Sequence, residues 1–179
     1  LVTFNIETIG QMSCNPAIGG LGKSHLVREV DALGGIMPLA TDRSGIQSRT
    51  LNTRKGFAVQ ALRVQCDRDK YKTAIQEILA ETNIVIIEGE VVDILVQKDT
   101  IMGVELNSGE KIYSTKTILT TGTFLNGVMF KGDEKFEGGR VGDKTSIPLS
   151  KKLYDLKLPM GRLITGTPAR IKLSSIDLS

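Results

Sequence analysis

The spacing of apolar residues along the chain predicts its helices. The pattern gives three of them, over residues 23–33, 58–80 and 149–156. In the first, Leu26, Val30 and Leu33 fall on one face at spacings of four and three residues, and Gly34 ends the helix. In the second, the long apolar pattern includes Cys66 and assigns it to the core.

Short apolar runs predict strands in the middle of the chain. The β-branched run at 84–87 is typical of a buried strand. Further strands are predicted at 1–4, 91–96, 101–106, 111–113 and 116–121. Polar turn sequences separate the strands that lie between residues 91 and 113, which predicts hairpins. Residues 41–57 show little apolar periodicity and predict an exposed loop. The pattern as a whole predicts a mixed α/β chain whose residues 83–122 are rich in strands.

Composition narrows the class of protein. The chain has 179 residues, of which 40% are hydrophobic and 24% charged, as in globular proteins with one core or slightly more. No apolar run reaches the roughly 18 residues of a membrane span, and no secretory leader is recognisable. Cys14 and Cys66 form no CxxC pair and there is one histidine, so we expect no metal site and a reducing, intracellular setting. Without an initiator methionine, the chain is expected to begin inside a domain.

The net charge of +3 hides an uneven distribution. Residues 43–72 carry eight basic groups against two acidic ones, and residues 144–172 carry seven against one. Residues 73–143 between them carry six basic groups against twelve acidic ones. The two basic segments are compatible with a face that binds phosphates or RNA, and equally with an ordinary solvated surface.

The glycine-rich stretch NPAIGGLGKS, residues 15–24, invites comparison with nucleotide-binding loops. A P-loop requires glycine at the position of Ala17 and a buried strand ahead of it, whereas residues 11–16 are mostly polar and contain a proline. The dinucleotide pattern GxGxxG also fails, because His25 stands where its last glycine belongs. Two interpretations remain: a glycine turn at a helix entrance that admits an anionic, carbonyl-bearing or flat ligand, or a plain tight turn.

Cys14 lies just ahead of this helix entrance. A thiol near a helix N-terminus gains nucleophilic character when its pKa is lowered, whereas a lone cysteine is more often a small buried apolar residue. Position alone leaves both roles open.

Several longer segments resemble one enzyme family in the family's own order. They are MSCNPAIGGLGK at 12–23, EVDALGG at 29–35, LNTRKG at 51–56, AVQALR at 58–63, TGTFL at 121–125, GGR at 138–140, SIPLS at 146–150, GRL at 161–163 and TGTP at 165–168. Together they resemble the MnmG (GidA) family of FAD-dependent enzymes that modify the wobble uridine of tRNA.

The resemblance implies a glutathione-reductase-type, Rossmann-like FAD-binding domain with an inserted β-meander, of which residues 1–179 would be a part. The family's N-terminal GxGxxG unit is missing from this sequence, and its NADH-binding insert and C-terminal helical domain are absent. Such enzymes work with an MnmE-type GTPase and add an aminomethyl or carboxymethylaminomethyl group to C5 of the wobble uridine, U34. The methylene group comes from methylene-tetrahydrofolate and NADH is the reductant. The family also implies a homodimer, either in the bacterial cytoplasm or in a mitochondrion.

The same resemblance assigns site residues. Cofactor contacts with FAD fall on Gly19, Gly20, Gly22, Val91, Gly122 and Ser146, and Cys14 is the catalytic candidate. The basic residues that follow the glycine stretch are expected to contact the tRNA backbone; they are Arg49, Arg54, Lys55 and Arg63.

Three positions depart from the family pattern. Phe57 and Ala169 stand where the family usually has proline, and Ile164 stands where it usually has lysine. These changes and the missing fingerprint keep an alternative open, in which the chain is a cofactor-less remnant that binds RNA or protein. Even as part of the enzyme, residues 1–179 alone are expected to be inactive.

Overall fold

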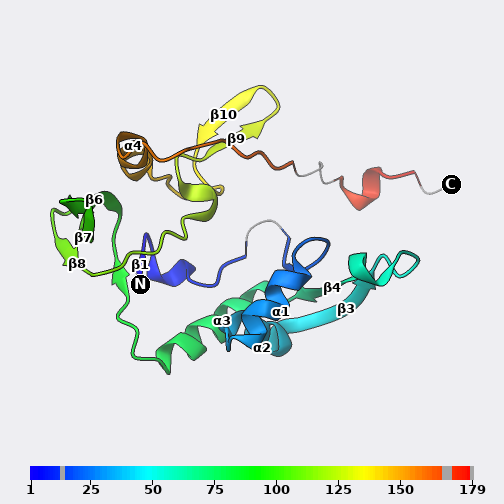
Figure 1. Cartoon of the computed structure of the whole chain (residues 1–179). Helices are drawn as coiled ribbons and strands as arrows, with labels where there is room; N and C mark the ends of the chain where they lie inside the picture. Colours follow the sequence, from blue (N-terminus) through cyan, green and yellow to red (C-terminus); the bar gives the residue numbers. More distant parts are fainter. Residues whose placement is uncertain (13–14, 167–170, 178–179) are drawn as a thin grey trace.

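The computed structural model describes residues 1–12, 15–166 and 171–177 and arranges them in two layered parts (Figure 1). The helices are α1 (Ser24–Ala32), α2 (Ile36–Ser44), α3 (Arg68–Ala80) and α4 (Ile147–Asp155). The strands are β1 (Val2–Thr3), β2 (Ala17–Gly19), β3 (Gly45–Leu51), β4 (Ala61–Cys66), β5 (Ile87–Glu88), β6 (Val91–Gln97), β7 (Thr100–Leu106), β8 (Lys111–Tyr113), β9 (Val128–Lys131) and β10 (Glu134–Glu137). Four short 3-10 helices are η1 (Ile6–Thr8), η2 (Phe57–Val59), η3 (Gly122–Phe124) and η4 (Leu173–Ser175).

The first part packs α1, α2 and α3 around an antiparallel sheet with strand order β2-β4-β3. Its core is built by buried apolar side chains of α2, β4 and α3, of which Ala40 and Cys66 are the most deeply buried. The Asp67 carboxylate begins α3, because it accepts hydrogen bonds from the backbone N–H groups of Asp69 and Lys70, each at 3.0 Å. Burial of the apolar side chains between α2, β4 and α3 stabilises the first part.

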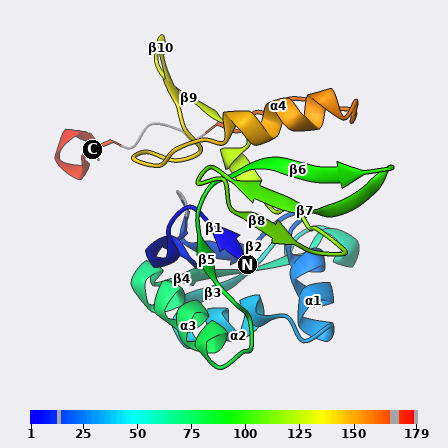
Figure 2. The ribbon, with the colours of Figure 1, turned by 90° about the vertical axis from the view of Figure 1, so that its left-hand side faces the viewer.

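The second part is an antiparallel β6-β7-β8 meander with α4 packed beside it (Figure 2). The β6–β7 turn places Lys98 and Asp99 at φ of 47° and 61°, the conformation of a tight two-residue hairpin. A small core joins Ile94 of β6 to Leu149 and Leu153 of α4. A hairpin of β9 and β10 extends from this part, and a short parallel pair of β1 and β5 lies between the two parts.

Several sequence-based predictions are confirmed. The helix expected at 23–33 is α1, the helix at 149–156 is α4 shifted by one or two residues, and the three meander strands coincide with β6, β7 and β8. Cys66 is buried, with 1% of its surface exposed. The expected apolar face of α1 is exposed in this chain, however, with Leu26 at 62% and Leu33 at 89% exposure.

Two predictions around the first sheet are wrong. Residues 41–57 are not a loop, because α2 extends to Ser44 and β3 follows. The first six residues of β3 are exposed, so no alternation of buried and exposed positions marks this strand in the sequence. The helix expected over 58–80 begins only at Arg68, because residues 61–66 form β4. Hydrogen bonding to β2 and β3 makes residues 61–66 a strand, although their apolar pattern is compatible with a helix.

Two further predictions of strands are wrong in whole or part. The run at 84–87 contributes only its last residue to β5, and Val85 is 72% exposed. Residues 116–121 form no strand, and Ile118 is 86% exposed. Neither segment has a neighbouring strand along its full length among the described residues. Without a partner strand, a β-branched run forms no inter-strand hydrogen bonds that would stabilise an extended conformation.

Candidate functional site

The glycine turn connects β2 to α1. Gly19, Gly20 and Gly22 adopt φ of 85°, 112° and 68°, which favours glycine at all three positions. The Gly20 N–H donates to the Leu62 carbonyl at 2.9 Å, so the turn is fixed to β4. A Cβ on Gly19 would lie 2.3 Å from that same carbonyl oxygen, whereas a Cβ on Gly20 or Gly22 would meet nothing within 4 Å. The backbone at Gly20 and Gly22 therefore leaves room on one side.

Ser24 occupies the place that a P-loop gives to its magnesium-binding hydroxyl. Its side chain is buried, and its Oγ lies 3.0 Å from the Gly20 carbonyl and within hydrogen-bond distance of the Leu62 carbonyl. A hydroxyl bonded to its own turn in this way is not directed at a triphosphate. The structure thus supports the sequence argument against a P-loop, although a three-residue strand, β2, does precede the turn.

A second group of predicted FAD positions gathers beside α4. The Ser146 hydroxyl donates to the Val91 carbonyl at 3.3 Å, although 55 residues separate the two. The Ser146 N–H donates to the Phe124 carbonyl at 2.8 Å, which ties it to η3, the short helix that begins at Gly122. Gly122 has a φ of 54° and open space at its Cβ position. Val91, Ser146 and the Gly122 turn therefore form one group, in which Gly122 starts a 3-10 helix instead of ending a strand.

The predicted tRNA contacts line the β3–β4 hairpin. Arg49 and Arg63 are directly opposite each other in the β3–β4 register, and Gly19 is opposite Arg63 on its other side. Arg54 and Lys55 are exposed at the end of the hairpin that extends away from the helices (Figure 1). No carboxylate of the described residues forms an ion pair with any of the four cations.

The sequence predicted only part of this arrangement of Arg49, Arg54, Lys55 and Arg63. The sequence indicated the four cations but placed them on a loop and a helix, so it gave no sign that Arg49 and Arg63 are neighbours across strands. Like charges directly opposite on paired strands destabilise a sheet. The arrangement therefore favours binding of an anion over this face.

A cavity of about 230 Å³ lies between α1, α2 and the first sheet. Gly19 and Ser24 line it on one side, and Arg28, Asp31 and Asp42 add charged groups that sequence reasoning did not single out. Ligand pockets usually measure about 300–1,000 Å³. The described residues therefore offer an open surface beside the glycine turn and not a pocket that encloses a large ligand.

Other predicted positions fall outside these groups. Cys14 and Ala169 lie outside the described residues. Phe57 begins η2 and is 91% exposed, and Ile164 is 87% exposed. Burial raises the pKa of the Tyr71 phenol, with Cys66 as a second cause, but this group belongs to the core between α2 and α3 and not to the glycine turn.

Membrane-spanning helices and metal clusters are both absent from the part of the chain that the structure describes. None of its helices is both long and apolar enough for a membrane crossing. No group of three or more histidine, cysteine, aspartate or glutamate side chains among these residues is arranged to hold a metal ion.

Comparison with known proteins places the chain. All of residues 1–179 match the family model described as Glucose inhibited division protein A. Among solved structures the chain is similar to Aquifex aeolicus GidA in its form I crystal, with 46% identity over 99% of this chain and a TM-score of 0.88. The form II crystal of Aquifex aeolicus GidA gives 46% identity over 88% of this chain and a TM-score of 0.81. This chain spans 30% of the length of the first of those chains and 26% of the second.

Proposed function

Because this chain belongs to the Glucose inhibited division protein A family, we propose that it forms part of the FAD-binding domain of a tRNA-modifying enzyme. The domain would be the Rossmann-like, glutathione-reductase type, and the β6-β7-β8 meander would be its insertion. The NADH-binding insert and the C-terminal helical domain would belong to parts of the protein outside residues 1–179.

The residues present fit a flavin nucleotide. Gly20, Gly22 and Gly122 offer backbone at positive φ with open space where a side chain would stand, which a flat ring or a phosphate can approach closely. Buried Ser146, whose hydroxyl donates to the carbonyl of half-buried Val91, forms a second polar anchor. These two groups would hold FAD, which supplies hydride transfer when bound. Their own task is to orient the cofactor and to exclude water from it.

The observation that carries the tRNA part of the proposal is the row Gly19–Arg63–Arg49 across the first sheet. It sets beside the glycine turn two guanidinium groups that have no carboxylate partner among the described residues. Arginine forms bidentate hydrogen bonds with phosphate oxygens, and such contacts position a nucleic acid without reading its sequence. Together with Arg54 and Lys55, the row would bring the tRNA backbone to the same side of the sheet as the flavin.

The proposed reaction follows from the family. The enzyme would add an aminomethyl or carboxymethylaminomethyl group to C5 of U34, with Cys14 as the candidate nucleophile. It would draw on methylene-tetrahydrofolate and NADH, and would work as a homodimer with an MnmE-type GTPase in the bacterial cytoplasm or in a mitochondrion.

The first test is the colour of the purified full-length protein. A yellow sample with flavin absorbance is expected, or a colourless one that becomes yellow on incubation with FAD and stays yellow after removal of the unbound FAD. A protein that is colourless once unbound FAD has been removed contradicts the proposal and favours the remnant that binds RNA or protein without a cofactor. Binding of tRNA, measured on the same sample, then separates an RNA-binding remnant from a protein-binding one.

A further inference from the structure

The segment 4–11 connects the two parts of the molecule. On one side, the Gln76 side chain of α3 donates to the Ile9 carbonyl at 3.2 Å, and Ile9 packs against the core of the first part. On the other side, the Phe4 ring lies 6.3 Å from the Phe124 ring, measured between centroids. The segment therefore contacts α3, which belongs to the glycine-turn part, and η3, which belongs to the part that holds Ser146.

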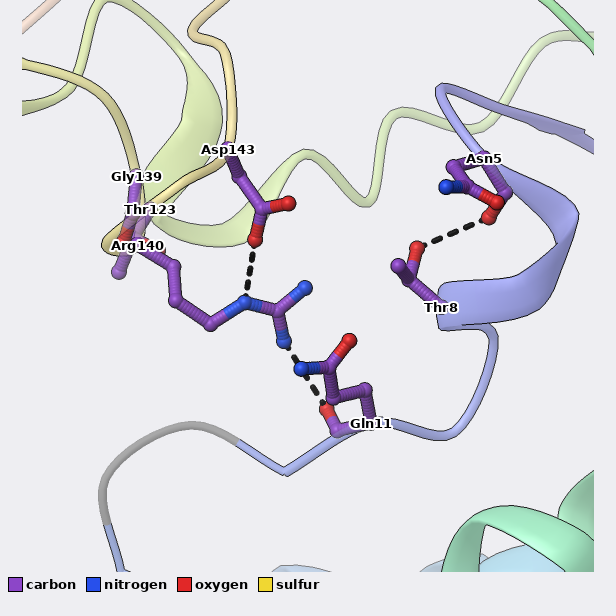
Figure 3. A network of polar contacts seen from close by, with 7 residues as sticks. All are labelled: Asn5, Thr8, Gln11, Thr123, Gly139, Arg140 and Asp143. Carbon is purple, nitrogen blue, oxygen red and sulfur yellow. Dashed lines mark hydrogen bonds and ion pairs between the residues drawn. The ribbon is translucent and has the colours of Figure 1, made fainter.

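Arg140 fastens this segment to the second part (Figure 3). Its Nε forms an ion pair with the Asp143 carboxylate, and its guanidinium lies over the Phe124 ring at 5.7 Å. Its Nη1 donates to the Gln11 carbonyl at 3.5 Å, a long hydrogen bond that spans 129 residues of sequence. Only a planar, multidentate cation makes these three contacts at once. The Arg140 side chain is 19% exposed, so solvent screens its ion pair with Asp143 only in part.

The turn that carries Arg140 is built closely against the same aromatic ring. A Cβ on Gly139 would lie 2.6 Å from the Phe124 ring, and Gly138 adopts a φ of 147°. The Thr123 hydroxyl donates to the Gly139 carbonyl at 3.0 Å. Because the Phe124 carbonyl in turn accepts the Ser146 N–H at 2.8 Å, the guanidinium is connected to the Ser146 group through one residue.

We propose that Arg140 is a positioning residue that aligns the two halves of the flavin site. The inference rests on the proposed function, because FAD is the ligand that would contact both the glycine turn and the Val91–Ser146 group. A ligand that spans two groups binds tightly when the protein holds them in register beforehand, and binds more weakly when it must order them itself. Arg140 supplies this register through Gln11, at the end of the connecting segment.

The test measures FAD affinity and the stability of the flavin-free, full-length protein in parallel. Arg140→Met keeps the aliphatic stem and removes the fork, Arg140→Lys keeps the charge alone, and Asp143→Asn releases the Nε partner. The matched control is Lys135→Met, because Lys135 also lies over a phenylalanine ring, that of Phe130 at 5.8 Å, but on the exposed β9–β10 hairpin.

Arg140→Met is expected to raise the FAD Kd by about 10-fold or more, because bound FAD would then have to order the two groups itself. Arg140→Lys should recover little of that affinity, Asp143→Asn should give an intermediate Kd, and Lys135→Met should remain within about twofold of wild type. The unfolding midpoint of the flavin-free Arg140→Lys variant should stay close to that of wild type.

Four results would overturn the inference. Arg140→Met that binds FAD within twofold of wild type removes the positioning role. If Arg140→Lys restores the full FAD affinity, the positive charge alone explains the role of Arg140. If the stability of the flavin-free protein falls together with FAD affinity in every variant, Asp143→Asn included, Arg140 contributes only to folding. A wild-type protein that binds no FAD refutes the proposed function, and this inference with it.

Discussion

The arginine pair of the first sheet should oppose folding while it favours tRNA binding. Arg49 and Arg63 are directly opposite on β3 and β4 and have no carboxylate partner among the described residues. Cross-strand pairs of this kind differ by about 0.2–1 kcal/mol according to their charges. Arg49→Gln should therefore raise the free energy of unfolding of the full-length protein by about that amount at low salt.

The gain should behave as a pair interaction. Salt should reduce it, because both arginines are at least partly exposed and exposed charges are screened. Arg63→Gln should give a similar gain, whereas the double variant should gain no more than either single one, since one substitution already removes the repulsion. Urea unfolding at low and high salt measures all three free energies.

Binding of tRNA should change in the opposite direction. For every phosphate that an arginine no longer neutralises, the slope of log affinity against log salt should become shallower by about 0.7–0.9, and the double variant should therefore show a decrease of about 1.4–1.8. Fluorescence anisotropy of labelled tRNA between about 50 and 200 mM salt covers the range in which this slope is steep. Lys98→Asn is the control, because it removes one exposed charge from the distant β6–β7 turn and asparagine tolerates the positive φ there.

Two results would contradict these expectations. If the double variant keeps the wild-type salt slope, the row does not bind phosphates, whatever happens to stability. If either single variant is destabilised by more than about 1 kcal/mol, the guanidinium groups contribute favourable packing and their repulsion is not the dominant effect.

Four further changes test other parts of the molecule. Ser146→Ala should lower the free energy of unfolding by about 0.5–1.5 kcal/mol, because it removes the hydrogen bond to the Val91 carbonyl. A larger decrease with FAD present than without it, measured by urea unfolding, would separate a flavin role from a structural one. Phe57→Pro should be neutral or stabilise by about 0.4–1 kcal/mol, because the position begins a 3-10 helix after an extended residue; a lower urea midpoint would contradict this. Tyr71→Phe should flatten the alkaline decline in stability. The buried phenol has a pKa above its ordinary 10.0, so wild-type stability is kept below that pH and falls as the pH rises towards the folded-state pKa. Thermal unfolding between about pH 9 and 11 follows it, and identical curves for both proteins would refute the assignment. Cys14→Ser should abolish uridine modification while FAD absorbance is retained, and full turnover would remove Cys14 from the mechanism.

The sequence predicted a helix or strand correctly where the pattern of buried and exposed residues marks that element. The meander was predictable because its strands are apolar runs separated by polar turn sequences. Strand β3 was not, because six of its seven residues are exposed and periodicity reports only burial. The start of α3 carried a usable signal in Asp67, whose side chain caps the helix. A helix that starts after this cap divides residues 58–80 at the boundary between β4 and α3, as in the structure.

The candidate site shows the same division. The glycines were recognisable singly, because positive φ restricts the residue type. The contact between Ser146 and Val91 and the register of Arg49 with Arg63 are long-range pairings, which no local pattern encodes. Arg140 is the clearest case, because its importance follows only from the approach of residues 129 positions apart.

The stretch 15–24 illustrates why residue types alone leave the chemistry of a glycine turn open. Its Gly-Lys-Ser ending fits a P-loop, and the decision rests on where the serine hydroxyl goes. In this fold Ser24 is buried and bonded to carbonyls of its own turn and of β4, so it is a structural residue that holds the turn against the sheet. The Gly20 N–H also donates to the Leu62 carbonyl, which sets the turn beside Arg63, the next residue of β4. Because Ser24 holds the glycine turn against β4, an anionic ligand at the turn would also lie near Arg63. A serine that bound magnesium would not hold the turn against this strand.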